Sequence, residues 1–448
     1  METVVVVGVG YIGLPLAASL ANVGYRVIGL DIDQKKVDHL NATYEPDIYE
    51  PGVKETLLKN KKNISFTTSY QEAISPADTL FITVGTPVTD ANEPDFRYIK
   101  SAAENIGKHL KKGQLLILKS TVVIGTTQNY FKDILEKISG LKAGEDFYLA
   151  FCPERTIEGL ALHELYNLPK IVGGINKESS ERCKKVVERL GSKVFIVSSP
   201  EVAEVCKLID NIYRSINIGF ANEVGMLCEH LGINAHEVVN TVNASYNRTN
   251  IFTPGLGADG PCLSKDPIIF KYSAQKIGSP YIMADACIDI NLFSTYRFMD
   301  MIQQFLEKNA VSNPKIALIG LAFKGFPETD DIRGSPALKL FEKLKNITIK
   351  NVKHISFSFY DPIITSFNGT TSSNSLEDAV ENADIILFLT NHRALMNVDF
   401  ISLLKKINID NKKKILIIDC WGNISNYSSA YSDKRVEYFR IGDGTKHE

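Results

Sequence analysis

Residues 3–13 read Thr3-Val4-Val5-Val6-Val7-Gly8-Val9-Gly10-Tyr11-Ile12-Gly13, and an apolar segment follows as far as Asn22. A β-branched run, a glycine-rich turn and an apolar stretch of this length predict a strand, a tight turn and a helix. A second strand is expected at residues 25–30, and Asp31 comes directly after it. This order is the first half of a βαβ unit.

The glycines of this turn have the Gly-x-Gly-x-x-Gly spacing that is typical of dinucleotide-binding loops. In such loops the first glycine allows the tight turn and the second lets the backbone approach a pyrophosphate. The third permits close packing of helix and strand, and the helix N-terminus offers N–H donors. The predicted cofactor contacts of the loop are Gly8, Gly10, Tyr11, Ile12 and Gly13. An ordinary turn is the alternative interpretation.

Asp31 lies 18 residues after Gly13, near the position where such units carry an acidic residue that binds the adenosine ribose. A carboxylate there accepts hydrogen bonds from the ribose hydroxyls and repels a 2′-phosphate. We therefore expect NAD as the cofactor in preference to NADP. The alternative is a residue that merely ends a strand or a turn.

Strand-like and helical segments alternate along the rest of the chain. Further strands are predicted at residues 79–84, 114–119, 170–172, 315–320, 354–360, 384–390 and 414–419. Residues 201–232 contain no proline and predict one long helix, whereas the glycine-rich residues 243–267 predict a loop. The alternation favours parallel sheets covered by helices on both faces.

The expected fold class is therefore α/β, with two Rossmann-like doubly wound parallel-sheet domains joined by a long central helix. The predicted boundaries are 1–200 for the NAD-binding domain, 201–308 for a central helical region with the cysteine loop, and 309–448 for the C-terminal domain. The apolar positions on several faces of the long helix predict that it forms the interface of a homodimer.

Composition narrows the class of partner. Among 448 residues, 50 are Lys or Arg and 52 are Asp or Glu, so neither a nucleic acid nor an anionic membrane is expected as a partner. Seven scattered cysteines do not resemble a disulfide framework and favour a reducing, cytoplasmic location. No metal site is predicted.

A second informative segment, residues 254–267, reads Pro-Gly-Leu-Gly-Ala-Asp-Gly-Pro-Cys-Leu-Ser-Lys-Asp-Pro. Cys262 has little apolar bulk around it, unlike a core cysteine, and Lys265 would favour its thiolate. These features are those of a nucleophile. An incidental cysteine in a loop is the alternative.

Several further motifs occur in one order along the chain. They are Glu50-Pro51-Gly52, Val84-Gly85-Thr86-Pro87, Lys119-Ser120-Thr121-Val122, Pro153-Glu154-Arg155, Ala203-Glu204 with Lys207 and Asn211, Asn222-Glu223, Cys262 to Asp266, and Phe323-Lys324 with residues 330–336. Together with the glycine loop and Asp31, they resemble the UDP-glucose/GDP-mannose dehydrogenase family.

The resemblance implies a four-electron oxidation of the C6 alcohol of a UDP-sugar to a carboxylate. The first hydride transfer would give an aldehyde, and Cys262 would add to it as a thiohemiacetal. A second hydride transfer would give a thioester, which water hydrolyses. Two NAD would be consumed per sugar.

By resemblance, Lys207 would stabilise the alkoxide or oxyanion with help from Asn211, and both would also contact the substrate. Asp266 and Thr121 would position or activate the hydrolytic water, with Glu154 as a further acid/base candidate. Which carboxylate acts as the base is left open. A solvated charge pair on a helix is the alternative for Lys207.

The resemblance assigns further residues to ligand contacts. On the cofactor side these are Thr86, Thr121 and Glu158, with Lys265 and with Arg333 near a diphosphate. On the substrate side they are Arg155, Arg248, Gly257 and Lys324. A role in surface solubility is the alternative for the charged members.

Two departures from the family pattern concern the loops. The family commonly has Gly-Gly-x-Cys, where this chain has Asp259-Gly260-Pro261-Cys262, so Pro261 removes an N–H beside the nucleophile. A Pro-Pro pair often follows Ser-Thr-Val, but this chain has Val123-Ile124 there. Loop geometry is therefore expected to differ more than the fold.

Arg155 after Pro153-Glu154 resembles enzymes that act on N-acetylated sugars, so a UDP-N-acetylhexosamine, UDP-N-acetylmannosamine or UDP-N-acetylglucosamine, is expected ahead of UDP-glucose. Its acid would serve as a precursor of a surface polysaccharide or glycan. If Arg155 only pairs with a local carboxylate, it says nothing of the sugar. A UDP-glucose 6-dehydrogenase, a two-electron dehydrogenase of the 6-phosphogluconate or 3-hydroxyacid type, and a non-catalytic NAD-binding subunit are the competing functions.

Overall fold

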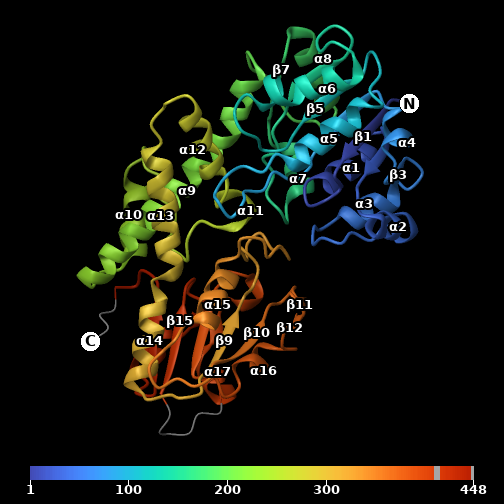
Figure 1. Cartoon of the computed structure of the whole chain (residues 1–448). Helices are drawn as coiled ribbons and strands as arrows, with labels where there is room; N and C mark the ends of the chain where they lie inside the picture. Colours follow the sequence, from blue (N-terminus) through green and yellow to red (C-terminus); the bar gives the residue numbers. More distant parts are fainter. Residues whose placement is uncertain (408–413, 445–448) are drawn as a thin grey trace. The chain divides into compact units, whose positions relative to one another are not determined.

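The computed structural model describes residues 1–407 and 414–444, and the chain divides into two compact units. Unit 1 comprises Met1–Asn211 and Lys265–Tyr281, and unit 2 comprises Ile212–Ser264 and Ile282–Glu448. Helix α9 (Pro200–Leu231), green in Figure 1, begins in unit 1 and ends in unit 2. The predicted long central helix is confirmed to within one residue at each end. The predicted three-part division of the chain stays a prediction.

Unit 1 contains an eight-stranded sheet in the order β3-β2-β1-β4-β5-β6-β7-β8. Its strands are β1 (Thr3–Val7), β2 (Arg26–Leu30), β3 (Ile64–Thr67), β4 (Thr79–Ile82), β5 (Leu115–Leu118), β6 (Tyr148–Phe151), β7 (Lys170–Gly174) and β8 (Val194–Ile196). Neighbouring strands are parallel except β6 and β7, which pair antiparallel and so correct the expectation of a wholly parallel sheet.

The alternation of side chains along β1 explains why this sheet is covered on both faces. Val4 and Val6 belong to one buried cluster and Val5 and Val7 to another, because successive side chains of a strand point to opposite faces. The first cluster takes in α1 (Gly13–Asn22), α2 (Gln34–Thr43), α3 (Val53–Lys59), α7 (Ala161–Asn167) and α8 (Lys177–Glu188). The second takes in α4 (Tyr70–Ile74), α5 (Arg97–Gly107), η1 (Thr126–Phe131), α6 (Lys132–Ser139) and the start of α9.

Unit 2 repeats this arrangement on a smaller scale. Its main sheet has the order β10-β9-β13-β15-β17 and is parallel throughout. The strands are β9 (Lys315–Ile319), β10 (Ser356–Tyr360), β13 (Ile385–Phe388), β15 (Ile415–Asp419) and β17 (Val436–Arg440). Two short pairs, β11 (Ser366–Phe367) with β12 (Thr370–Thr371) and β14 (Val398–Asp399) with β16 (Ile424–Ser425), lie outside it.

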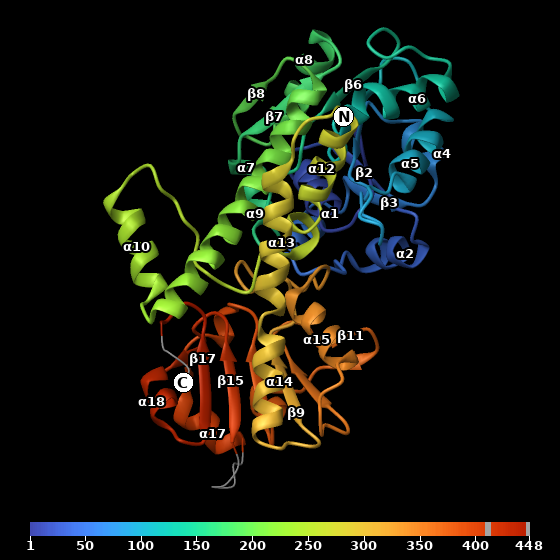
Figure 2. The same ribbon diagram turned by 60° about the vertical axis from the view of Figure 1, so that its left-hand side comes forward.

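Helices cover both faces of the second sheet as well. Ile316 and Leu318 of β9 pack with α14 (Phe298–Lys308) and α15 (Pro336–Asn346). Figure 1 shows these two helices beside the second sheet. Ala317 and Ile319 pack on the opposite side with α16 (Leu376–Val380), α17 (Phe400–Ile407) and α18 (Tyr427–Ser432), the last two lying near β15 and β17 in Figure 2. The predicted fold class is confirmed.

One predicted segment is wrong in part. Residues 243–267, expected to be a single loop, begin with the end of α10 (Ala235–Ser245) and contain α11 (Gly260–Leu263). Helix α12 (Asp266–Lys276) begins before the segment ends, and α13 (Ile282–Tyr296) follows it. Short helices escape composition-based reasoning because glycine and proline also occupy their first positions. Among the residues described, no helix is long and apolar enough to cross a membrane.

Candidate active site

The glycine loop of unit 1 has the geometry of a pyrophosphate cradle. Gly8 adopts φ +91° directly after β1, and a Cβ on Gly13 would lie 1.8 Å from the Gly8 carbonyl oxygen. At Gly10, by contrast, no atom of the described residues lies within 4 Å of the position that a Cβ would take. No side chain in this part of the chain caps the N-terminus of α1. Open backbone and uncapped N–H groups fit the diphosphate of NAD.

Asp31 is fixed at the edge of the glycine loop. Its Oδ2 accepts a hydrogen bond from the Val9 N–H at 2.9 Å, and its Oδ1 accepts one from the Asp33 N–H at 3.1 Å. The residue is half-buried at the end of β2. A carboxylate held in this way retains lone pairs for the ribose hydroxyls of NAD.

The carboxyl ends of β4 and β5 bring two of the predicted residues together. The Thr86 hydroxyl donates a 2.5 Å hydrogen bond to the Thr121 carbonyl oxygen. Next to them, the Ser120 hydroxyl donates to the Val84 carbonyl oxygen at 2.6 Å. Ligands of open α/β sheets bind beyond the carboxyl ends of the strands, so this pair lies where a cofactor is expected.

Glu154 lies after β6 in a buried ion pair. Its Oε2 is 3.3 Å from Lys119 Nζ, and the two side chains are 9% and 3% exposed. Burial opposes the charge on Glu154, but Lys119, Lys170 and two backbone N–H donors outweigh burial and lower its pKa to about 2. A carboxylate so stabilised is a weak base, which argues for a structural role over the predicted acid/base role.

One face of α9 carries three of the motif residues. Glu204 is buried and accepts hydrogen bonds from the Gly125 N–H (2.6 Å), the Thr127 N–H (2.9 Å) and the Thr127 hydroxyl (2.6 Å). It thereby ties the loop that follows Thr121 to the helix that carries Lys207. Burial raises the pKa of Glu204 to about 7, against the lowering effect of these hydrogen bonds.

The next turns of α9 lead to a buried polar cluster at the start of α12. Asn211 donates from Nδ2 to Asp266 Oδ2 at 2.5 Å, and Lys265 Nζ donates to Asp266 Oδ1 at 2.7 Å. Asp266 is fully buried and Asn211 is 4% exposed. The structure thus brings together three predicted site residues that come from two separate segments of unit 1.

Lys207 differs from its neighbours in this cluster. It is 8% exposed, yet it makes no hydrogen bond or ion pair within residues 1–407 and 414–444. A buried ammonium without a partner is costly unless a ligand supplies one. Lys207 is therefore available to an anion or to a developing oxyanion.

Arg155 is engaged within its own unit. Its Nη1 lies 3.0 Å from Asp210 Oδ2 on α9, and its Nη2 donates to the Pro169 carbonyl oxygen at 2.8 Å. The local pairing considered as the alternative for Arg155 is therefore present. The half-buried Glu158 lies in the same segment, next to Gly159.

Unit 2 contains the predicted nucleophile. Of the seven cysteines, all in the described part of the chain, Cys262 alone is exposed, and the seven form no disulfide. Cys262 is the third residue of the short helix α11. Pro261 occupies the first turn of that helix, where an N–H has no intrahelical acceptor, so the proline removes no helical hydrogen bond.

Two predicted cations of unit 2 are held by their own loops. The Arg333 guanidinium pairs with Asp331 through Nε (2.9 Å) and Nη2 (2.6 Å), and its side chain remains 57% exposed. Lys324 Nζ donates to the Pro327 carbonyl oxygen at 2.5 Å. Arg248 is exposed and lies 4.5 Å above the Tyr246 ring.

The backbone geometry at position 257 requires glycine. Gly257 adopts φ +125°, and a Cβ there would lie 2.8 Å from the Asn291 carbonyl oxygen.

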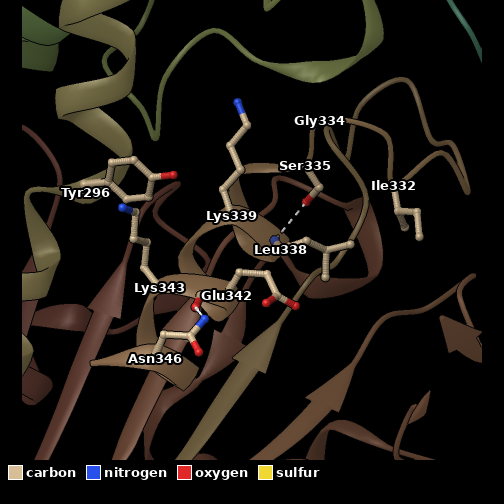
Figure 3. Close-up of a pocket in the computed structure, with 9 residues that line it drawn as sticks. All are labelled: Tyr296, Ile332, Gly334, Ser335, Leu338, Lys339, Glu342, Lys343 and Asn346. Atoms are coloured by element: carbon tan, nitrogen blue, oxygen red, sulfur yellow. Dashed lines mark hydrogen bonds between the residues drawn. The ribbon is translucent and has the colours of Figure 1, made fainter. Parts of the chain in front are cut away.

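A pocket of about 500 Å³ opens beside α15 in the same unit. Figure 3 shows its lining, which consists of Tyr296, Ile332, Gly334, Ser335, Leu338, Lys339, Glu342, Lys343 and Asn346. None of these residues was singled out individually from the sequence, although Ile332, Gly334 and Ser335 fall within the motif of residues 330–336. Their place in that motif could have identified Ile332, Gly334 and Ser335 from the sequence.

Glu50 is a structural residue that sequence reasoning did not single out. It is 6% exposed and accepts hydrogen bonds from the Gly159 N–H (2.7 Å) and the Ala161 N–H (2.8 Å). It thus holds the segment that carries Glu158. The signal was its place before Pro51-Gly52, in a motif to which no role was assigned.

Comparisons with known proteins agree with this geometry. Residues 2–213 match the NAD binding domain of the UDP-glucose/GDP-mannose dehydrogenase family, 201–292 its central domain and 317–426 its UDP binding domain. A UDP-N-acetyl-D-mannosamine dehydrogenase of Methanococcus vannielii is 34% identical over 96% of this chain and 94% of its own. An NDP-N-acetyl-D-galactosaminuronic acid dehydrogenase of Ralstonia solanacearum is 32% identical over 92% and 96%.

The fold comparison gives the same result. The solved structure of a UDP-D-ManNAc dehydrogenase from Pyrococcus horikoshii matches with a TM-score of 0.86 and 30% identity, covering 99% of this chain and all of that one. Sequence, fold and the arrangement of the glycine loop all agree. The chain therefore belongs to the UDP-glucose/GDP-mannose dehydrogenase family of NAD-dependent nucleotide-sugar 6-dehydrogenases.

Proposed function

We propose that this enzyme oxidises the C6 alcohol of UDP-N-acetyl-D-mannosamine to the carboxylate, with Cys262 as the covalent nucleophile. The observation that carries the choice of sugar is the 34% identity, over nearly the whole chain, to a protein named for that substrate. An acetamido group must find hydrogen-bond partners when it is buried, so a site that pairs with it disfavours glucose by roughly 1–3 kcal/mol.

Lys207 is the proposed electrostatic catalyst. Its ammonium is buried and has no partner in the described part of the chain, so its charge is not already neutralised. A fixed charge in a dry site stabilises a developing alkoxide or oxyanion more than it would in water. Asn211, one helical turn away on the same face of α9, is the proposed second donor.

Asp266 is the proposed residue that positions the hydrolytic water. Its two oxygens accept from Asn211 and Lys265, which orient the carboxylate. Thr121 is the proposed second contact of that water. Glu154 is the further acid/base candidate, although the ion pair with Lys119 lowers its pKa to about 2 and so makes it a weak base.

We assign separate groups of residues to NAD and to the UDP-sugar. NAD supplies the acceptor for the hydride in each oxidation. Asp31 and the glycine loop hold its adenosine half, and Thr86, Glu158, Lys265 and Arg333 are the other proposed contacts. The exposed thiol of Cys262 adds to the aldehyde carbon and later leaves when water attacks the thioester. Arg248, Gly257 and Lys324 are the proposed contacts of the UDP-sugar, with Arg155.

A panel of UDP-sugars tests the proposal. We expect kcat/KM, followed by NADH absorbance, to rank UDP-N-acetylmannosamine first, with UDP-N-acetylglucosamine next and UDP-glucose at least about tenfold lower. Two NADH should form per sugar. One NADH would point to a two-electron dehydrogenase, and none to a non-catalytic subunit.

UDP-glucose oxidation is the second candidate. The observation in its favour is that Arg155, the residue that indicated an N-acetylated sugar, is already bound to Asp210 and Pro169. A direct contact with an acetamido group would have to share or break these bonds. A tenfold preference for UDP-glucose in the panel would select this candidate.

We also propose a homodimer built around the unit 2 part of α9. Tyr213, Phe220 and Leu227 recur every seven residues and are 56%, 50% and 59% exposed. An apolar stripe of this kind commonly marks an interface. Light scattering at micromolar concentration should give twice the chain mass, and a monomer mass would contradict the proposal. A cytoplasmic location, and the absence of nucleic-acid and membrane partners, stay predictions.

A further inference from the structure

The residue three positions before Cys262 carries a buried carboxylate. It is Asp259, whose side chain is 7% exposed. Lys339 of α15 forms an ion pair and hydrogen bond with Asp259 Oδ1. The Thr295 hydroxyl, near the end of α13, lies 3.4 Å from Oδ2. This buried carboxylate thus has two partners inside unit 2, both from distant parts of the sequence.

The backbone around Asp259 is anchored at several neighbouring points. The Ala258 N–H donates to Asn291 Oδ1 at 2.9 Å, and the Gly260 N–H donates to the Gly334 carbonyl oxygen at 3.2 Å. Gly260 adopts φ +91° and packs so closely on Phe323 that a Cβ would lie 2.3 Å from that ring. Cys262 follows only two residues later, so its place depends on these anchors.

The electrostatics of the pair are asymmetric. Burial raises the pKa of Asp259, and Lys339 and Thr295 act in the opposite direction. The Lys339 side chain is 31% exposed. Figure 3 shows it extending away from Glu342 and Lys343 at the pocket beside α15. Without Lys339 the carboxylate would be buried and unpaired, whereas Lys339 without Asp259 could turn to solvent.

We propose that the Asp259–Lys339 ion pair holds residues 258–262, which include Cys262, against α15, which makes Asp259 and Lys339 positioning residues for the nucleophile. The inference rests on the proposed role of Cys262. Lys339 and Thr295 engage both oxygens of the carboxylate, so its role is to hold the segment and not to take part in the chemistry.

A double-mutant cycle tests the proposal on the full-length enzyme. Lys339→Met leaves the buried Asp259 unpaired, and we expect it to lower kcat at least about tenfold. It should also slow the alkylation of Cys262 by iodoacetamide, followed by peptide mass spectrometry. Asp259→Gly with Lys339→Met removes both charges and should restore kcat to within about threefold of wild type. KM for NAD should stay unchanged in both.

Two further variants complete the experiment, Lys308→Met as a control and Asp259→Glu as a second test. Lys308→Met removes an exposed ion pair with Glu437, on α14 and β17, and should change neither kcat nor alkylation. Asp259→Glu keeps the charge but lengthens the side chain, so it should keep the melting temperature while still lowering kcat and the alkylation rate. Asp259→Glu decides the question if Lys339→Met does not fold.

The outcomes separate this inference from the proposed function. Alkylation and kcat at wild-type values in folded Lys339→Met or Asp259→Glu would overturn the positioning role. So would a double variant no more active than Lys339→Met. Cys262→Ser addresses the proposed function separately: substantial acid production by that variant would refute the role of Cys262 itself, whatever the cycle shows.

Discussion

The first strands of the two sheets lead into the same turn. Gly8 follows β1 with φ +91°, and its N–H donates to the Leu30 carbonyl oxygen at the end of β2 (2.7 Å). Gly320 follows β9 with φ +89°, and its N–H donates to the Tyr360 carbonyl oxygen at the end of β10 (2.8 Å). In both units the next strand is followed directly by an aspartate.

The two aspartates differ in what remains for a ligand. Asp31 is half-buried and accepts hydrogen bonds from two backbone N–H groups, those of Val9 and Asp33. Asp361 is 6% exposed and accepts from the N–H groups of Leu321, Ala322, Ile363 and Ile364. A carboxylate offers about four lone-pair sites, so Asp361 has none left for a ribose. The two units therefore share a turn but differ in what it can bind, because Asp31 keeps free hydrogen-bond acceptor sites and Asp361 does not.

The largest effect is expected from removing the proposed nucleophile of unit 2 while the NAD-binding unit 1 is left intact. Cys262→Ser in unit 2 should lower kcat by ~10³-fold or more, because it removes the covalent step. NAD binding by unit 1, followed by fluorescence titration, should change by no more than a few fold. Near-normal acid production would contradict this. If the first oxidation survives, mass spectrometry should detect released aldehyde or a trapped ester.

The next effect tests the turn of unit 1. A Cβ at Gly13 would meet the Gly8 carbonyl oxygen at 1.8 Å, so Gly13→Ala should cost about 3 kcal/mol. If that loss falls on the binding conformation, NAD affinity drops about a hundredfold. Gly10→Ala is the matched control. No described atom would meet its Cβ, so it should keep the melting temperature and raise only KM for NAD.

Substitution of Asp31 should have a smaller effect, on the preference for NAD over NADP. Wild-type enzyme should prefer NAD over NADP at least about tenfold, because one unfavourable charge contact of ~1.4 kcal/mol gives that factor. Asp31→Ala should narrow the preference, measured as the ratio of kcat/KM values. Asp361→Ala should leave the ratio unchanged and lower the melting temperature, since it orphans buried N–H groups. Equal efficiency of wild type with both cofactors would contradict the argument.

A measurement of stability extends the same reasoning to pH. Burial raises the pKa of Glu204 from 4.5 to about 7 in the folded state. Its contribution to stability is therefore fully present below pH 4.5 and is lost as the pH rises through 7. The free energy of unfolding should fall less between pH 5 and 8 in Glu204→Gln than in wild type. A pKa that differs by one between the folded and unfolded states corresponds to about 1.4 kcal/mol of this difference.

Glu154 provides the opposite case in the same unit. Its pKa is lowered to about 2, so its contribution is present above 4.5 and is lost as the pH falls toward 2. Glu154→Gln should therefore flatten the acid side of the stability profile. Urea unfolding followed by circular dichroism measures both variants. Identical pH profiles for the two would show that neither carboxyl titrates as described.

Local sequence predicted those strands whose apolar runs were bounded by turns. β1, β2, β9 and β15 were found to within two residues at either end, because β-branched residues and glycine or aspartate mark their ends. Strands β3, β6 and β8, of three or four residues each, were not predicted, although β4 and β5 are as short and were. The edge strand β17 carries Glu437 and Arg440, which blur its pattern.

The sequence by itself determined the α/β class, the long helix, the glycine loop with Asp31, and the cysteine loop. In each of these the chemistry resides in residues close together along the chain, or in motifs of fixed order. Only the tertiary structure decided which polar groups already have a hydrogen-bond or ion-pair partner within the chain. Arg155 and Asp210 lie 55 residues apart, and Asp259 and Lys339 lie 80 apart. Such pairings form when separate elements pack, and the hydrogen-bonding capacity left over depends on that packing.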